Sequence, residues 1–139
     1  MTKHQYRVLL IASIIISFVG GGVDFVFPQL VPDAFHQAQS MLDEDMSLAR
    51  ILVMIGLGSA TVIVSFVSFY GLYCFRPWAP RVALVATALT LLFMPLAGTF
   101  AESGVAISLM LLSAYLWGAA VVLAHIQPFS AHFAQPNAR

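Results

Sequence analysis

Asp24 is the residue of this chain whose position most suggests a chemical role. It follows Gly20, Gly21 and Gly22 within the stretch ISFVGGGVDFVFPQ, which is otherwise almost entirely apolar. A carboxylate in this setting suits three structures: the cleavage region of a signal peptide, the proton-binding acid of a transporter, or a packing patch near the end of a membrane helix. The other charged residues of the chain help to separate these interpretations.

The depth of Asp24 along an apolar helix argues against proton transport. At a rise of about 1.5 Å per residue, Asp24 lies about 24 Å beyond the start of the apolar stretch at Val8, and the membrane midplane falls near Ser17. Transporters place their ionisable group near the midplane, as small four-helix multidrug transporters do with a glutamate in their first helix. Asp24 is therefore expected near the outer boundary of the membrane.

Arg50 is the expected partner of Asp24, because it is the only basic residue predicted on the same side of the membrane. Its guanidinium group can hold a carboxylate with two hydrogen bonds, and desolvation penalises an isolated charge at this depth. The glycines at 20–22 would let the second membrane helix approach closely. We predict a structural ion pair between Asp24 and Arg50. The competing interpretation is that Asp24 reaches the water of the headgroup layer.

No other group of residues has the spacing of a catalytic or metal site. The histidines are expected on both sides of the membrane and cannot all form one site; they are His4, His36, His125 and His132. The acidic run 43–45 lacks the ligand spacing of a calcium loop, and the sequence has no HExxH or GxSxG motif. The single cysteine, Cys74, excludes an internal disulfide bond and a CxxC motif. We predict no catalytic residue, no cofactor and no metal site, and hence no enzyme.

The composition is that of an integral membrane protein. Hydrophobic residues make up 60% of the 139 residues and charged residues only 9%, against about 25% charged residues in soluble domains. A net charge of zero without a basic cluster argues against nucleic-acid binding. Four continuous apolar segments have the length of a membrane helix, namely residues 8–27, 51–75, 82–100 and 105–126. The sequence predicts one all-α domain over residues 1–139, an integral membrane four-helix bundle.

The distribution of charge predicts an orientation. All six acidic residues lie toward the first and third loops. Five basic residues lie in the N-terminus, the second loop and the C-terminus: Lys3, Arg7, Arg76, Arg81 and Arg139. Because basic residues remain cytoplasmic, both termini are expected in the cytoplasm, with an interfacial aromatic belt at the same surface formed by Tyr6, Tyr70, Tyr73 and Trp78. The charged start and the apolar run 8–19 also match a signal peptide, but we expect this segment to be retained as the first span.

The segment between the first two spans is amphipathic. Its apolar residues recur at helical spacing, and they are Val31, Ala34, Phe35, Ala38, Met41 and Leu42. Pro32 suits a first helical position. We predict a short outer helix over roughly Pro32 to Met41. Its residues Phe35, Met41 and Leu42 either pack on the bundle or form a docking face for a partner.

Short loops and small residues are expected to shape the bundle. The loops CFRPWAPR and GTFAESG predict antiparallel hairpins of spans two and three and of spans three and four. Pro95 is expected to bend the outer end of the third span. Small residues at spacing four allow close helix contacts in lipid, within one chain or between chains. They occur as Ser13/Ser17/Gly21, Gly56/Ala60, Ala83/Thr87 and Ala114/Gly118.

The turn FRPWA at Phe75–Ala79, together with the closing stretch AYLWGAAVVLAHIQPFSAHF, resembles an uncharacterised group of small bacterial four-span inner-membrane proteins. The resemblance extends over nearly the whole chain. It implies the same four-span topology in a bacterial inner (cytoplasmic) membrane. The group has no assigned activity, so the resemblance implies no functional residue.

Association within the membrane is the expected function. The inner loops are short and no charged residue is expected at the membrane centre, so we predict a non-enzymatic protein that acts as an oligomer, an accessory subunit or an immunity-type protein. Its partners would be the lipid bilayer and a second copy, or another membrane or periplasmic protein. The alternative is a small transporter or channel formed by four-helix protomers.

Overall fold

The computed structural model describes residues 1–31, 48–97 and 102–134, and every regular element in these ranges is helical. The long helices are α1 (Lys3–Val26), α3 (Leu48–Tyr73), α4 (Ala79–Ala97) and α5 (Gly104–His125). Two short elements are the 3₁₀ helix η1 (Pro28–Leu30) and the helix α6 (Ala131–Ala134). The predicted all-α fold is confirmed for the described residues.

The long helices coincide with the predicted apolar segments. Three of them, α1, α3 and α5, are long and apolar enough to cross a membrane, whereas the apolar stretch of α4 is shorter, Ala79–Pro95. α1 begins before the predicted start of the first span because Thr2 and Gln5 form a capping box. Thr2 N–H donates to Gln5 Oε1 at 2.9 Å, and Gln5 N–H donates to Thr2 Oγ1 at 3.2 Å.

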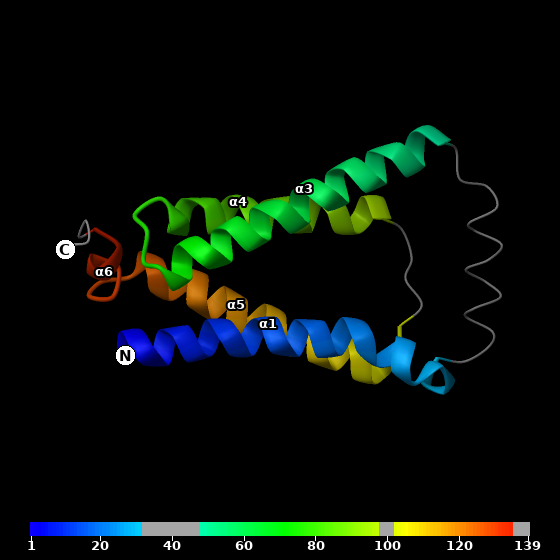
Figure 1. Ribbon diagram of the computed structural model, residues 1–139, viewed down its shortest axis with the longest axis horizontal. Helices are drawn as coiled ribbons and strands as arrows, with labels where there is room; N and C mark the ends of the chain where they lie inside the picture. The colour runs from blue at the N-terminus through cyan, green and yellow to red at the C-terminus, as the bar shows by residue number, and fades with distance from the viewer. Residues whose placement is uncertain (32–47, 98–101, 135–139) are drawn as a thin grey trace.

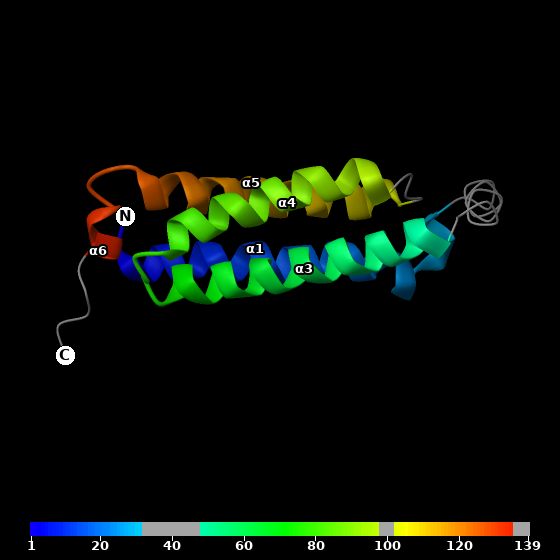
Figure 2. The same ribbon diagram turned by 90° about the horizontal axis from the view of Figure 1, so that it is seen from above.

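The long helices form two antiparallel pairs (Figures 1 and 2). α3 packs along α4, as the short loop between them predicted, and α1 packs along α5. The second predicted hairpin is present in direction only: α5 runs antiparallel to α4 but packs chiefly on α1. Helices that are neighbours in sequence are therefore the main packing partners in one pair, and the first and last long helices are partners in the other.

Small residues bring α1 and α5 together. A Cβ atom added at Gly20 would lie 3.1 Å from Leu109 Cβ, so the backbone of α1 contacts α5 directly. Ser113 Oγ donates a hydrogen bond of 2.7 Å to Ser13 O. Lipid provides little hydrophobic drive between helices, so close backbone contact and interhelical hydrogen bonds stabilise such a pair.

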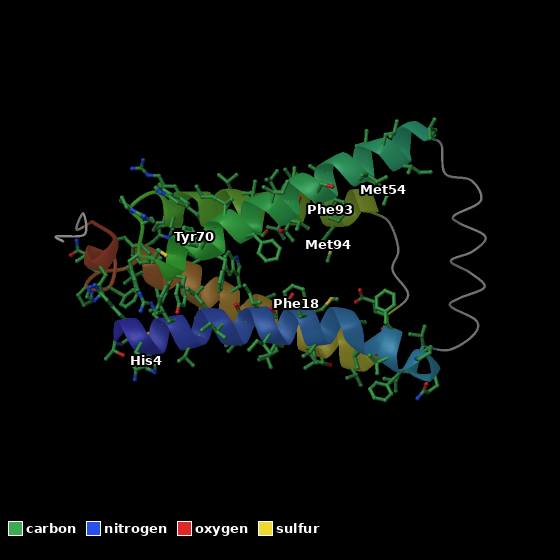
Figure 3. All side chains as sticks on the ribbon, viewed as in Figure 1. His4, Phe18, Met54, Tyr70, Phe93 and Met94 are labelled. Atoms are coloured by element: carbon green, nitrogen blue, oxygen red, sulfur yellow. The ribbon has the colours of Figure 1, made fainter. Side chains whose placement is uncertain are left out.

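The two pairs meet in one buried cluster at the end of the bundle where α1 begins. The members of this cluster are Tyr6, Leu10, Leu72, Phe75, Ala79, Ala83, Ala120, Val121, Ala124, Phe129 and Phe133. Toward the other end the pairs diverge in Figure 1. There Phe18 and Met94 are exposed, and Figure 3 shows both pointing into the region between the pairs. The described helices are therefore joined chiefly at one end.

The end of α3 is a Schellman motif. Arg76 N–H donates to Gly71 O at 2.9 Å, and Phe75 N–H donates to Leu72 O at 3.1 Å. The left-handed position of such a motif usually holds glycine, but here it holds Phe75, with a φ of 54°. A bulky residue in this conformation costs about 1–3 kcal/mol and persists only where the surroundings hold it in place. Burial of the Phe75 ring in the cluster provides this restraint.

Gly71 provides the space that the turn into α4 needs. A Cβ atom added at Gly71 would lie 2.6 Å from the Trp78 ring and 2.8 Å from Ala79 Cβ. Both distances are far below van der Waals contact. Although the Trp78 ring can swing aside, Ala79 Cβ is fixed to the backbone of α4. A side chain at position 71 would therefore push the start of α4 away from α3.

Gly71→Ala is expected to lower the free energy of unfolding by about 1–3 kcal/mol, the usual cost of overpacking. Unfolding in detergent, followed by circular dichroism, measures this loss. Gly118→Ala is the matched control, because a Cβ atom added at Gly118 meets nothing within 4 Å. It should leave stability unchanged or raise it. Equal tolerance of both substitutions would contradict the close approach of Ala79 to Gly71.

Candidate functional site

Asp24 forms hydrogen bonds with Ser103, the residue that caps the start of α5. The carboxylate lies in the last turn of α1 and is partly buried. Its Oδ2 accepts a hydrogen bond from Ser103 N–H at 2.8 Å, and its Oδ1 accepts one from Ser103 Oγ at 2.5 Å. Both carboxylate oxygens therefore have a donor, and the contact joins the end of α1 to the start of α5.

Ser103 serves α5 and Asp24 at the same time. It is the N-cap of α5, with extended backbone angles, and its Oγ accepts a hydrogen bond from Ala106 N–H at 3.1 Å. The start of a helix carries a partial positive charge, so a carboxylate placed there gains about 0.3–1 kcal/mol. Charge-assisted hydrogen bonds add to this gain. The arrangement stabilises α5 and the α1–α5 pair together.

The predicted pairing of Asp24 with Arg50 stays a prediction. Arg50 belongs to α3, but the structure does not describe its side chain. The structure does not show the expected role of the glycines: Gly20 packs against α5 rather than α3, and a Cβ atom added at Gly22 meets no described residue within 4 Å. A serine just before an apolar segment is typical of an N-cap, so the sequence does mark Ser103. Nothing in the sequence relates it to Asp24.

The predicted outer helix and its docking residues Phe35, Met41 and Leu42 lie outside the described residues. Both interpretations of that segment therefore stay predictions. The last described residues before this segment are those of η1 and Val31, whose side chain is 4% exposed.

Two of the described histidines, His125 and His132, make contacts within the chain. His125 Nδ1 lies 2.8 Å from Val121 O within its own helix, and the His132 ring meets the Phe129 ring edge-on with centroids 5.1 Å apart. Within residues 1–31, 48–97 and 102–134, no group of three or more His, Cys, Asp or Glu residues is arranged to hold a metal ion.

Two cations near the start of α1, Lys3 and Arg7, lie on aromatic rings. The Arg7 Cζ atom is 4.8 Å from the centroid of the Tyr73 ring and 5.5 Å from that of Phe75, and Lys3 Nζ is 5.4 Å from the Phe75 centroid. Arg7 Nε–H also donates to Tyr73 O at 3.2 Å, at the last residue of α3. The helix dipole favours a cation there. Lys3 and Arg7 are four residues apart, but sequence alone does not reveal the rings that they meet.

Asp24→Asn and Ser103→Ala should each destabilise the protein by about 1–3 kcal/mol, because each leaves a polar group without its partner. Ser103→Ala also removes the cap of α5. Only the coupling between the two substitutions therefore reports the contact. We expect the double variant to lose clearly less stability than the sum of the single losses, measured by unfolding in detergent.

The matched control is the cycle of Asp24→Asn with Arg50→Gln. Coupling in that cycle would support the predicted ion pair, and additive effects would refute it. Additive effects of the Asp24 and Ser103 substitutions would contradict the hydrogen-bonded contact between α1 and α5 described above.

The FRPWA turn that carries the family resemblance is part of the junction between the helix pairs. Phe75 and Ala79 are buried in the cluster, and Trp78 lies against Gly71. The turn thus has a structural role in this chain, and the resemblance to small bacterial four-span proteins stays a prediction. Comparison with protein-family models, with curated proteins and with solved structures finds no match to this chain.

Proposed function

We propose that this chain is a non-enzymatic integral membrane protein that acts by association, as an oligomer, an accessory subunit or an immunity-type protein. In this proposal four helices cross a bacterial inner membrane and both termini lie in the cytoplasm. Three helices are long and apolar enough to do so. The fourth, α4, has 19 residues and a length of about 28 Å, close to the thickness of about 30 Å of the hydrocarbon core.

Charge supports the proposed orientation. Lys3, Arg7 and Arg76 lie at the end of the bundle where α1 begins. Asp24 and Glu102 lie at the other end. Basic residues flanking membrane helices remain on the cytoplasmic side. The end with the N-terminus is therefore the cytoplasmic end in this proposal.

The observation that carries the proposed association is an exposed pair of small residues on α3. Gly58 faces α4, because a Cβ atom added there would lie 3.4 Å from the Phe93 ring. Two residues along an α-helix correspond to a rotation of about 200°, so Gly56 and Ala60 lie on the opposite side of α3. A Cβ atom added at Gly56 meets nothing within 4 Å, and Ala60 is exposed. Contacts within the described chain do not use this pair.

Larger apolar residues border the small ones. Leu52 and Ile63 lie on the same side of the helix and are both exposed. We call this surface, formed by Leu52, Gly56, Ala60 and Ile63, the α3 face. Small residues between larger ones let a second helix approach to backbone distance, which is how helices associate in lipid. The α3 face therefore suits contact with a helix of another chain.

Ala60→Leu should weaken association by about fivefold to thirtyfold, the ratio that corresponds to about 1–2 kcal/mol. Energy transfer between labelled copies in liposomes, measured over a range of protein-to-lipid ratios, reports it. Ala88→Leu on α4 is the matched control, because Ala88 is also exposed and undergoes the same change. Equal effects of both substitutions, or a wild-type chain that stays monomeric at every ratio, would contradict association through the α3 face.

The orientation has its own test. A fluorescent reporter fused after Arg139 should fold and emit, because the proposal places the C-terminus in the cytoplasm. An alkaline phosphatase fused at the same position should be inactive, since this enzyme works only in the periplasm. An active phosphatase fusion would refute the orientation or the number of spans.

The transporter or channel alternative has less support. Asp24 is the only acidic residue within the four long helices, and both of its oxygens bind Ser103 at one end of the bundle. A carboxylate that couples transport normally lies near the membrane centre. The alternative would gain support if Asp24→Asn abolished a proton flux in proteoliposomes while stability stayed unchanged.

A further inference from the structure

Lys3 and Arg7 form a pair of cations without an acidic partner among the described residues. They are four residues apart on α1, so their side chains lie on one face of the helix, and both lie about equally far from the Phe75 ring centroid, at 5.4 and 5.5 Å. The six acidic residues of the chain all lie at positions 24–45 or at 102. The described residues at this end of the bundle thus include no carboxylate side chain, and two like charges lie side by side.

Most hydrogen-bond donors of Arg7 have no acceptor among the described residues. A guanidinium group has five N–H bonds, and the described chain accepts only that of Nε, through Tyr73 O at 3.2 Å. The side chain is partly buried, and its stacking on the Tyr73 ring restricts its movement. A planar cation with several donors matches a ligand with several acceptor oxygens, such as a phosphate group.

The Phe75 ring, on which both cations lie, is itself held in a fixed place. Its centroid lies 5.6 Å from that of Tyr6 and 5.2 Å from that of Phe133. The side chain is 6% exposed and its backbone is locked in the left-handed turn. The folded chain therefore positions the cation pair before any ligand arrives, which lowers the entropic cost of binding.

An apolar strip continues from the cation pair into the membrane. Ile11 and Phe18 follow Arg7 on the same face of α1, and they are 41% and 66% exposed. Figure 3 shows Phe18 extending from α1 toward α3 and α4. A ligand with a hydrocarbon chain would cover the strip while its headgroup met the cations.

We propose that Lys3 and Arg7 bind the phosphate group of an anionic phospholipid, whose acyl chain lies along Ile11 and Phe18. The apolar strip favours a lipid over a soluble phosphate compound. The two neighbouring cations favour a headgroup without a positive charge, such as phosphatidylglycerol, because the ammonium group of phosphatidylcholine would be repelled. Binding would supply the negative charge that this end of the bundle lacks.

This inference requires insertion into a bilayer but not association between chains. The α3 face lies on the side of α3 opposite α4 and carries none of the residues invoked here. Ala60→Leu should therefore leave lipid binding unchanged even where it abolishes association. The two proposals can fail separately.

The test uses the full chain in detergent and measures bound lipid by native mass spectrometry and the midpoint of thermal unfolding. Phosphatidylglycerol should bind and raise the midpoint, whereas phosphatidylcholine and glycerol 3-phosphate should do neither at the same concentration. Lys3→Gln should weaken phosphatidylglycerol binding about fivefold, the contribution of one interfacial cation. Lys3 is exposed and makes no hydrogen bond through its side chain to the described residues, so this variant should still fold.

Two further variants make the test specific. Arg7→Lys keeps the charge but loses the planar array of donors, so it should also weaken binding. Arg81→Gln removes an exposed cation from the same end of the bundle, without a described aromatic contact, and should leave binding unchanged. Equal loss in Lys3→Gln and Arg81→Gln would overturn the site in favour of general attraction to the basic end.

Two other outcomes would also overturn parts of the proposal. Binding of glycerol 3-phosphate as tight as that of phosphatidylglycerol would overturn the lipid assignment and leave a site for free phosphate. Equal binding of phosphatidylcholine and phosphatidylglycerol would show that the apolar strip alone recognises lipid and would refute the role of the cation pair.

Discussion

The left-handed backbone at Phe75 is the constraint on which the described bundle depends. It ends α3 and turns the Phe75 ring into the cluster where the two helix pairs meet. Aromatic contacts with Tyr6, Phe129 and Phe133 follow, each contributing about 0.5–1.5 kcal/mol beyond area burial. Together they offset the cost of about 1–3 kcal/mol of the unfavourable conformation. Lys3 and Arg7 also lie on the Phe75 ring, so the junction and the candidate lipid site both depend on this residue.

The two ends of the bundle are held by different interactions. At the end where α1 begins, aromatic packing and the hydrogen bond from Tyr6 OH to Ala120 O join the elements. At the other end, the carboxylate of Asp24 caps α5 through Ser103, which secures the α1–α5 pair but does not join it to α3 and α4. The two pairs are therefore united at one end and free to diverge at the other.

The small residues of the chain divide into two groups that have different consequences for function. Ala83 is buried in the junction, and Thr87 Oγ1 accepts a hydrogen bond from Trp117 Nε1 at 3.1 Å. Ala83 and Thr87, which are four residues apart, therefore make their contacts within the chain. Gly56 and Ala60 have the same spacing but lie on exposed surface. Ala114 is also exposed, and a Cβ atom added at Gly118 meets nothing within 4 Å. In lipid, where hydrophobic burial does not drive helices together, the exposed pairs are the ones available for contacts between chains.

The sequence predicts where the long helices lie, because apolar length and capping residues act locally: the four predicted segments and the four long helices agree closely. It also predicted the α3–α4 hairpin from a short loop. Three contacts become visible only in the folded chain: Gly20 faces α5, Asp24 meets Ser103, and Lys3 and Arg7 share the Phe75 ring. These contacts cannot be read from the sequence, because the faces at which helices meet depend on the packing of all of them together. The left-handed turn at Phe75, which sets that packing, has no glycine to mark it in the sequence.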